Sequence, residues 1–215
     1  MKINPVKMER SKKLSVPTLS GYVWIFAAVS FFGWCFEKLG RWYLYPTDPI
    51  RDRGFLTLPF CGIYGTCAVA IGFLLGAPNF PSALGERIMK PLESFPRRIR
   101  ALGRIIGYFL AVTLIATLIE LAVGLPFALA GMPLWNYRDR WGNLFGVICP
   151  NYSILWGLMA TLLMSVVWKP GCLLVGRIPK RVLRIGAVSI ALVLFIDFAW
   201  NLIYVILTGS RFYFL

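Results

Sequence analysis

The chain has 215 residues, of which 58% are hydrophobic, and it carries a formal net charge of +14. Soluble domains average about 45–50% apolar residues, so this excess, with a mean hydropathy of +0.70, predicts an integral membrane protein. The sequence contains no histidine, which excludes His-ligated zinc or haem and His-activated nucleophiles. It also lacks a GxxxxGK[ST] motif, which excludes ATP hydrolysis by a P-loop. We therefore expect no metal and no other cofactor.

Five apolar runs are each long enough for a membrane-spanning helix, which needs roughly 20 residues. They predict an all-α, polytopic transmembrane helix bundle in which residues 1–215 form one integral membrane domain. The predicted spans are 19–44, 55–77, 104–130, 146–168 and 185–209.

Lysine and arginine gather before the first run, between the second and third, and between the fourth and fifth. Because these residues mark the cytoplasmic side of a membrane, the alternation predicts a cytoplasmic N-terminus and an extracytoplasmic C-terminus. The largest basic segment is a predicted cytoplasmic loop at 78–103, which its prolines divide into short interfacial turns. Orientation and attraction to anionic headgroups explain the net charge, so we expect membrane lipids as partners and no nucleic acid.

Polar residues recur at helical spacing on three of the predicted spans, and an ionisable side chain in hydrocarbon indicates a functional site by default. The three stripes are Trp34, Glu37, Lys38 and Arg41; Thr113, Thr117, Glu120 and Gly124; and Asp197, Asn201 and Tyr204. They converge toward the extracytoplasmic half of the bundle, which favours a polar cavity there. The structural alternatives are an interfacial ion pair between Glu37 and Arg41 and interhelical hydrogen bonds at Glu120 and Asp197.

The second predicted span starts irregularly, with Pro59, Gly62 and Gly65 within seven residues. A regular helix is costly there, and non-helical backbone at membrane depth must be satisfied by protein or water. We therefore expect an interrupted helix start that lines the cavity, with Arg53 just before it. The alternative for Arg53 is a role as an interfacial anchor.

The segment between the third and fourth spans adds aromatic and polar side chains on the same predicted side, although tyrosine and tryptophan also form interfacial belts. These residues are Trp135, Asn136, Tyr137, Arg138, Asn143, Asn151 and Tyr152. The candidate substrate-binding residues of the whole chain are Glu37, Arg53, Tyr64, Glu120, Tyr137, Asn143, Asn151, Trp156, Asp197 and Asn201. We assign no catalytic residue and no metal ligand.

Three segments between residues 33 and 157 carry a family resemblance. The first is Gly33-Trp34-Cys35-Phe36-Glu37, of the pattern GW..E. The second joins Arg53-Gly54-Phe55-Leu56 to Pro59-Phe60-Cys61-Gly62-Ile63-Tyr64-Gly65, similar to RGFL.GP.CPIYG. The third runs from Glu120 through Trp135-Asn136-Tyr137 and Asn143-Leu144-Phe145-Gly146 to Trp156-Gly157.

In these segments the chain resembles the CmpB-like bacterial membrane proteins, described as ABC-transporter type IV permeases. The resemblance implies a permease in the bacterial cytoplasmic membrane. Asn136 stands where the family usually has Asp, Gly62 where it has Pro, and Leu58 where it has Gly. The change at Asn136 removes an anionic ligand from any cation site that the family shares.

These observations favour a small permease-like transport protein with a polar cavity open to the extracytoplasmic side. Glu37, Glu120 and Asp197 would bind a cationic or proton-coupled group, Arg53 would bind an anionic one, and the aromatic rings would pack the apolar part of a small or lipid-like solute. Five spans are few for a complete transporter, so we expect a homodimer or a membrane or ATPase partner subunit. Two alternatives stay open: an intramembrane enzyme acting on a lipid headgroup, and a non-catalytic accessory or scaffold subunit whose basic loop docks a cytoplasmic partner.

Overall fold

The computed structural model describes residues 17–44, 55–94 and 96–210, and its helical content confirms the predicted all-α, polytopic class. In chain order the elements are α1 (Leu19–Leu44), α2 (Gly62–Leu74), β1 (Gly76–Ala77), β2 (Phe80–Pro81), α3 (Ala83–Met89), the 3₁₀ helix η1 (Lys90–Ser94), α4 (Arg97–Leu129), α5 (Pro150–Leu163), the π-helical turn η2 (Met164–Trp168), α6 (Lys169–Arg177) and α7 (Lys180–Thr208).

Within the described residues, four helical stretches are long and apolar enough to cross a bilayer. They are Leu19–Gly40, Arg97–Leu129, Pro150–Arg177 and Lys180–Thr208. The predicted second span contains only α2, whose 13 residues extend about 20 Å at 1.5 Å per residue, against a hydrocarbon core of about 30 Å. The chain is therefore a membrane protein with four long helices and one short apolar helix between them.

The short length of α2 follows from the irregular segment 55–61 that precedes it. This segment, which contains Pro59, is non-helical, whereas Gly62 and Gly65 of the predicted irregular stretch lie within α2. The Cys61 amide donates to the Ser30 carbonyl of α1 at 2.9 Å. After α2, Gly76 takes a φ of +72° and turns the chain into the two-residue hairpin β1–β2. Glycine adopts this left-handed conformation without steric cost, so the helix ends there.

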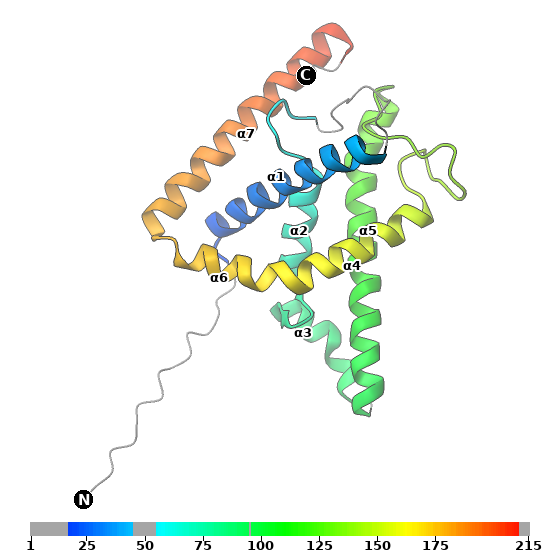
Figure 1. Cartoon of the computed structure of the whole chain (residues 1–215), viewed down its shortest axis with the longest axis vertical. Coiled ribbons are helices and arrows are strands. Elements are labelled where there is room, and N and C mark those ends of the chain that lie inside the picture. The colour runs from blue at the N-terminus through cyan, green and yellow to red at the C-terminus, as the bar shows by residue number, and fades with distance from the viewer. Residues whose placement is uncertain (1–16, 45–54, 95, 211–215) are drawn as a thin grey trace, which may run out of the picture.

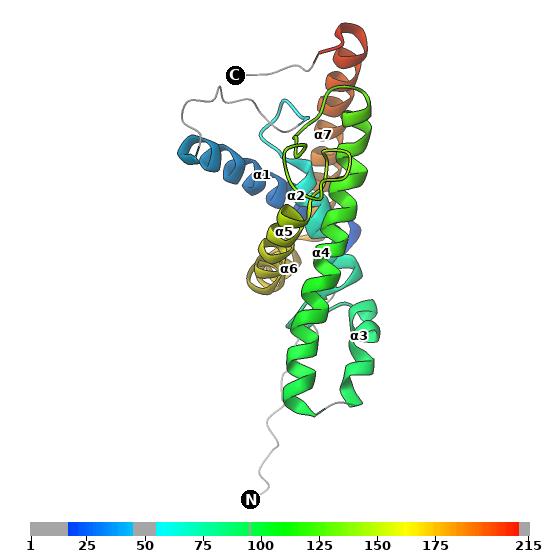
Figure 2. The same ribbon diagram turned by 90° about the vertical axis from the view of Figure 1, so that its right-hand side faces the viewer.

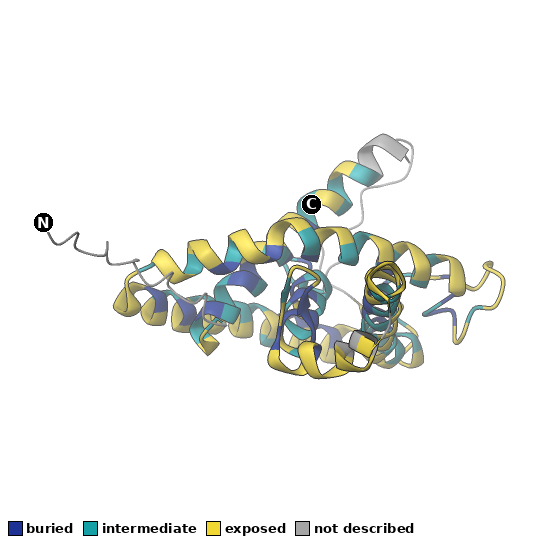
Figure 3. Ribbon diagram, turned by 90° about the horizontal axis from the view of Figure 1, so that it is seen from below, coloured by how far each residue is buried: buried dark blue, intermediate teal, exposed yellow. Residues whose placement is uncertain are grey.

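Figure 1 shows α4 along the long axis of the molecule, with α1 and the continuous α5–η2–α6 run crossing it. The helix pairs α1–α2, α4–α5, α1–α7 and α2–α4 are in contact. Their shared core contains Ile25 of α1, Ile71 of α2, Val112 of α4, and Met164 and Trp168 of η2. The outward faces of the helices are largely exposed (Figure 3), and their many large apolar side chains are typical of surfaces that face lipid.

The predicted basic loop at 78–103 is more ordered than its prolines indicated. It comprises β2, α3, η1 and the first turns of α4, which begins at Arg97, seven positions before the predicted start at 104. Pro96 occupies the N-cap position of α4, where the missing N–H of proline does no harm. In Figure 2, α3, η1 and the start of α4 project from the rest of the molecule as an antiparallel pair, at the opposite end from the last turns of α4 and α7.

Candidate functional site

A buried acid of α4 forms the centre of the candidate site. Glu120 is 5% exposed, and its Oε1 accepts a hydrogen bond of 3.0 Å from the Tyr137 hydroxyl. Tyr137 belongs to the segment 131–149 that connects α4 to α5, and its ring stacks on Tyr152 of α5 with centroids 4.5 Å apart. The Arg140 guanidinium lies 5.8 Å from the centre of the Tyr152 ring. The connecting segment therefore folds back onto the C-terminal part of α4 and the first turn of α5.

Trp156 links this acid to a second one. Its indole lies beside the Glu120 carboxyl, and its ring meets Tyr64 of α2 edge to face at 5.9 Å. The Tyr64 hydroxyl in turn donates to Oε1 of Glu37 on α1 at 2.7 Å.

Five of the predicted residues thus form one continuous group, which we call the acid–aromatic cluster. Its members are Glu37, Tyr64, Glu120, Tyr137 and Trp156. Each carboxylate receives a phenol hydroxyl, which satisfies part of the hydrogen-bonding demand that burial creates. Two aromatic rings, those of Tyr64 and Trp156, stand between the two acids, so the cluster combines carboxyl groups with π-faces.

Glycines bring the helices of the cluster close together. A β-carbon at Gly33 would collide with the Tyr64 ring, and one at Gly157 would collide with Thr113 of α4. Small residues at crossings let membrane helices approach closely. Gly33 therefore allows Tyr64 to reach Glu37, and Gly157 brings the neighbouring Trp156 beside α4.

The segment 131–149 is held by its own hydrogen bonds. The Tyr137 amide donates to the Gly146 carbonyl at 2.8 Å, and the Trp135 indole donates to the Val147 carbonyl at 2.7 Å. Phe145 takes a φ of +57°, a conformation that non-glycine residues seldom adopt. These contacts fix the position from which Tyr137 approaches Glu120.

Asp197 and Asn201 form a second polar cluster, on α7. Asn201 is 2% exposed and donates to Asp197 Oδ1 at 3.1 Å and to Thr57 Oγ1 at 2.8 Å. Asp197 Oδ2 accepts the Leu58 amide at 3.1 Å. These two predicted residues therefore tie the irregular segment 55–61 to α7, and their hydrogen bonds satisfy non-helical backbone at membrane depth.

The remaining predicted residues differ in their surroundings. Asn143 donates to the carbonyls of Arg138 and Arg140, and its Oδ1 accepts the Gly146 amide, so it organises the 131–149 segment. Asn151 is exposed at the start of α5. Arg53 lies outside the described residues, as does the side chain of Arg41, the predicted partner of Glu37.

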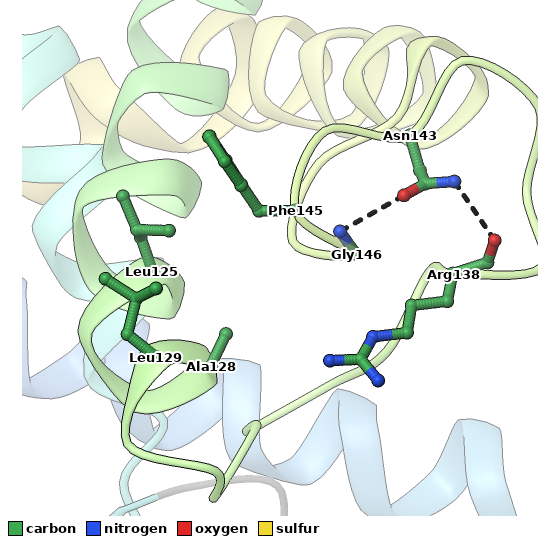
Figure 4. A pocket seen from close by; sticks show the side chains of 7 residues that line it. All are labelled: Leu125, Ala128, Leu129, Arg138, Asn143, Phe145 and Gly146. Carbon is green, nitrogen blue, oxygen red and sulfur yellow. Dashed lines mark hydrogen bonds between the residues drawn. The ribbon is translucent and has the colours of Figure 1, made fainter.

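A cavity of about 350 Å³ lies between the last turns of α4 and the 131–149 segment, as Figure 4 shows. Its lining consists of Leu125, Ala128, Leu129, Arg138, Asn143, Phe145 and Gly146. Asn143 is the member that this lining shares with the predicted substrate-binding residues. The sequence placed Arg138 in the correct segment, but only the fold brings its side chain opposite α4.

The described residues include no group of three or more Cys, Asp or Glu that could hold a metal ion. The acid–aromatic cluster offers carboxylates, hydroxyls and aromatic rings. Such a group can bind a cation by charge and by cation–π contact, and it can hold or release a proton at a carboxyl oxygen.

Comparison with known proteins identifies a family. The model of the family described as "Putative ABC-transporter type IV", of CmpB type, matches residues 24–202. No curated protein and no solved structure matches the chain. The matched range covers most of the chain and includes most of α1, all of α2, α4 and α5, and the whole acid–aromatic cluster. The chain therefore belongs to the CmpB-type family of ABC-transporter type IV membrane proteins.

Proposed function

We propose that this protein is a membrane transport component whose acid–aromatic cluster binds a cationic group or couples movement of the solute to a proton. The observation that carries the proposal is the buried Glu120 carboxyl, 5% exposed, with Tyr137 as a hydrogen-bond donor at 3.0 Å. Family membership supports a role related to membrane transport.

The physical argument rests on the cost of burying charge. A carboxylate in a membrane-spanning helix is expensive, and acids in such positions mark ion and proton pathways. Glu37 and Glu120 come from different helices, and the rings of Tyr64 and Trp156 lie between them. A solute with a positive group would be attracted to both acids and to the ring faces, while a proton would neutralise either acid.

The four long helices and the short α2 are few for a complete transporter. We therefore propose that the protein works as a homodimer or together with a membrane or ATPase subunit. The bacterial cytoplasmic membrane, with the 131–149 segment on the extracytoplasmic side, is the location that the charge distribution and the family favour.

The test uses purified protein in proteoliposomes loaded with a pH-sensitive dye. Choline, tetraethylammonium and spermidine are added outside, and proton movement is recorded against empty liposomes. We expect at least one of these cations to drive proton movement in the wild-type protein, and Glu120→Gln to abolish it. Glu86→Gln, an exposed carboxylate on α3, is the matched control and should behave like wild type.

Two results would contradict the proposal. One is a Glu120→Gln protein that moves protons at the wild-type rate. The other is a wild-type protein that behaves like empty liposomes with every cation and also shows no change in tryptophan fluorescence on their addition. Trp156 lies beside Glu120 and against Tyr64, so the part of the emission that is missing from Trp156→Phe reports binding even where transport needs an absent subunit.

A second candidate function is that of a membrane subunit that docks a cytoplasmic ATPase, as the family name suggests. The feature that favours it is the projection formed by α3, η1 and the start of α4 (Figure 2), with Arg87, Lys90, Arg97 and Arg98 exposed. Replacing Arg97, Arg98 and Arg100 by glutamine should remove a co-purifying ATPase. Replacing Lys180 and Arg181 at the start of α7 should leave the ATPase bound. If the variant at Arg97, Arg98 and Arg100 still retains the ATPase, the projection is not the docking surface.

A further inference from the structure

The cavity at the end of α4 has a different chemistry from the acid–aromatic cluster. One wall is apolar and consists of Leu125, Ala128 and Leu129 from the last turns of α4, and the opposite wall contains Arg138. In Figure 4 the guanidinium of Arg138 extends toward the α4 wall, and the cavity lies between them. Its volume of about 350 Å³ falls within the range of small-molecule sites.

The backbone around Arg138 is fixed on both sides. Its amide donates to Asn136 Oδ1 at 3.0 Å, and its carbonyl accepts the Asn143 side-chain amide at 3.0 Å. The stem of Arg138 lies against Gly146, where a β-carbon would approach the arginine Cγ to 2.6 Å. The glycine therefore leaves room for the arginine stem, and the exposed guanidinium extends beyond it.

The charge of this arginine is not balanced within the described part of the chain. No described carboxylate forms an ion pair with Arg138, although Asp139 is its neighbour. Asn143 uses its amide and its carbonyl oxygen within the 131–149 segment. A guanidinium offers several N–H donors in a plane and suits a phosphate group, which can accept two of them at once.

The apolar wall continues along α4 away from the cavity. Leu110, Leu114 and Leu118 follow one another at four-residue spacing and are 58%, 60% and 54% exposed. At 3.6 residues per turn they share a face with Leu125 and Leu129. Leu129 is itself 76% exposed, so the cavity opens onto this stripe, which would face the acyl chains of a bilayer.

We propose that the cavity binds the headgroup of an anionic phospholipid, with its phosphate on Arg138 and an acyl chain along the leucine stripe of α4. The arginine alone would accept any small phosphate. The apolar wall and its continuation into the stripe favour a ligand that carries an alkyl chain, because only such a ligand buries that surface. This site is independent of the acid–aromatic cluster, and neither proposal requires the other.

The test is native mass spectrometry of the full-length protein released from detergent micelles that contain one defined lipid. Palmitoyl-oleoyl phosphatidylglycerol is compared with palmitoyl-oleoyl phosphatidylcholine, which has the same chains and no net charge. We expect one phosphatidylglycerol to stay bound preferentially. Arg138→Gln should reduce its affinity about tenfold, since a charge-assisted hydrogen-bond pair is lost.

Matched variants separate this site from general attraction to a basic protein. Arg140→Gln removes an equal charge from the same segment outside the cavity lining and should leave binding unchanged. Ala128→Trp fills the cavity and keeps Arg138, so it should also lose the lipid. Thermal unfolding of both Arg138→Gln and Ala128→Trp in detergent verifies that they are folded.

Three outcomes would overturn the proposal. Equal retention of the two lipids would show that the headgroup charge is not recognised. Loss of lipid in Arg140→Gln equal to that in Arg138→Gln would show non-specific charge attraction. Displacement of the lipid by glycerol 1-phosphate at similar concentration would show that the ligand is a soluble phosphate, because the alkyl chain would then contribute nothing.

Discussion

The ring of Tyr64 on α2 lies directly against Gly33 of α1, so that a β-carbon at position 33 would come within 2.5 Å of two ring atoms. From this position the Tyr64 hydroxyl reaches Glu37, one helical turn further along α1. The glycine, the tyrosine and the acid are therefore one geometric unit. Glycine at position 33 of α1 therefore leaves the space that Tyr64 of α2 needs to reach Glu37.

Gly33→Ala should destabilise the protein by about 1–3 kcal/mol, the usual cost of inserting a methyl group into a tightly packed contact. Thermal unfolding in detergent measures this effect. Gly40→Ala on the same helix is the control, because nothing lies within 4 Å of a β-carbon at that position. Gly40→Ala should be neutral or stabilising, and an equal loss in both variants would refute the contact.

Tyr137→Phe should cost about 1–3 kcal/mol of stability, since it removes a hydroxyl donor from the buried Glu120 carboxyl. Tyr152→Phe is the control, because it keeps the ring that stacks on Tyr137. Unfolding of Tyr137→Phe, Glu120→Gln and the double variant gives the coupling between the two side chains. Additive effects in that cycle would show that the hydroxyl and the carboxyl do not interact.

Asn201→Leu should release the irregular segment 55–61 from α7. The asparagine donates to Thr57, and leucine has a similar size but no donor. Hydrogen exchange measured by mass spectrometry should show faster exchange in peptides covering 55–61, with little change in α4. Leu202→Ala, at an exposed neighbouring position of α7, should leave that segment unchanged, and unaltered exchange in Asn201→Leu would contradict the assignment.

Gly157→Ala should separate α5 from α4 and lower the unfolding temperature, because the added methyl group meets Thr113. The expected cost is about 1–3 kcal/mol. Gly171→Ala on α6 provides the control, since a β-carbon there meets nothing within 4 Å. Adding Thr113→Ala to Gly157→Ala should partly restore the stability. If it does not, the strain in Gly157→Ala does not come from the contact with Thr113.

The membrane orientation predicted by the basic segments is testable with fusions to alkaline phosphatase, which folds only where its disulfides form. A fusion after Gly209 should be active, and one after Lys90 should be inactive. The reason is that Lys90 lies in the basic projection, whereas the last turns of α7 are predicted to be extracytoplasmic. Activity after Lys90 together with inactivity after Gly209 would reverse the orientation.

Much of the helical architecture followed from hydropathy. The predicted first span, 19–44, has the bounds of α1, and the predicted fifth, 185–209, ends within one residue of α7. The fourth run was harder to delimit, because its helical path continues through a π-helical turn and Lys169 to Arg177. The predicted span ended at 168, but tertiary packing around Trp168, which is 5% exposed, keeps the path helical.

The candidate site was partly predictable for a similar reason. Acids in apolar runs stand out in a sequence, so Glu37, Glu120 and Asp197 could be found there. Which of them meet could not be found, because helical spacing gives the face of each helix and not its neighbour. The structure joins Glu37 and Glu120 through the rings of Tyr64 and Trp156, and it places Asp197 in another cluster.

The sequence by itself determined that this is an all-α membrane protein, which segments contain its apolar helices, and that an irregular segment precedes the second of them. These features depend on the local composition of the chain, because burial in hydrocarbon requires long apolar segments whose backbone is satisfied internally. Only the tertiary structure decided the contacts of Tyr137 with Glu120 and of Tyr64 with Glu37, and the cavity beside Arg138. These contacts and this cavity depend on close helix crossings at glycines and on the 131–149 segment, which folds back onto the helices. Neither feature can be deduced from the sequence of one helix alone.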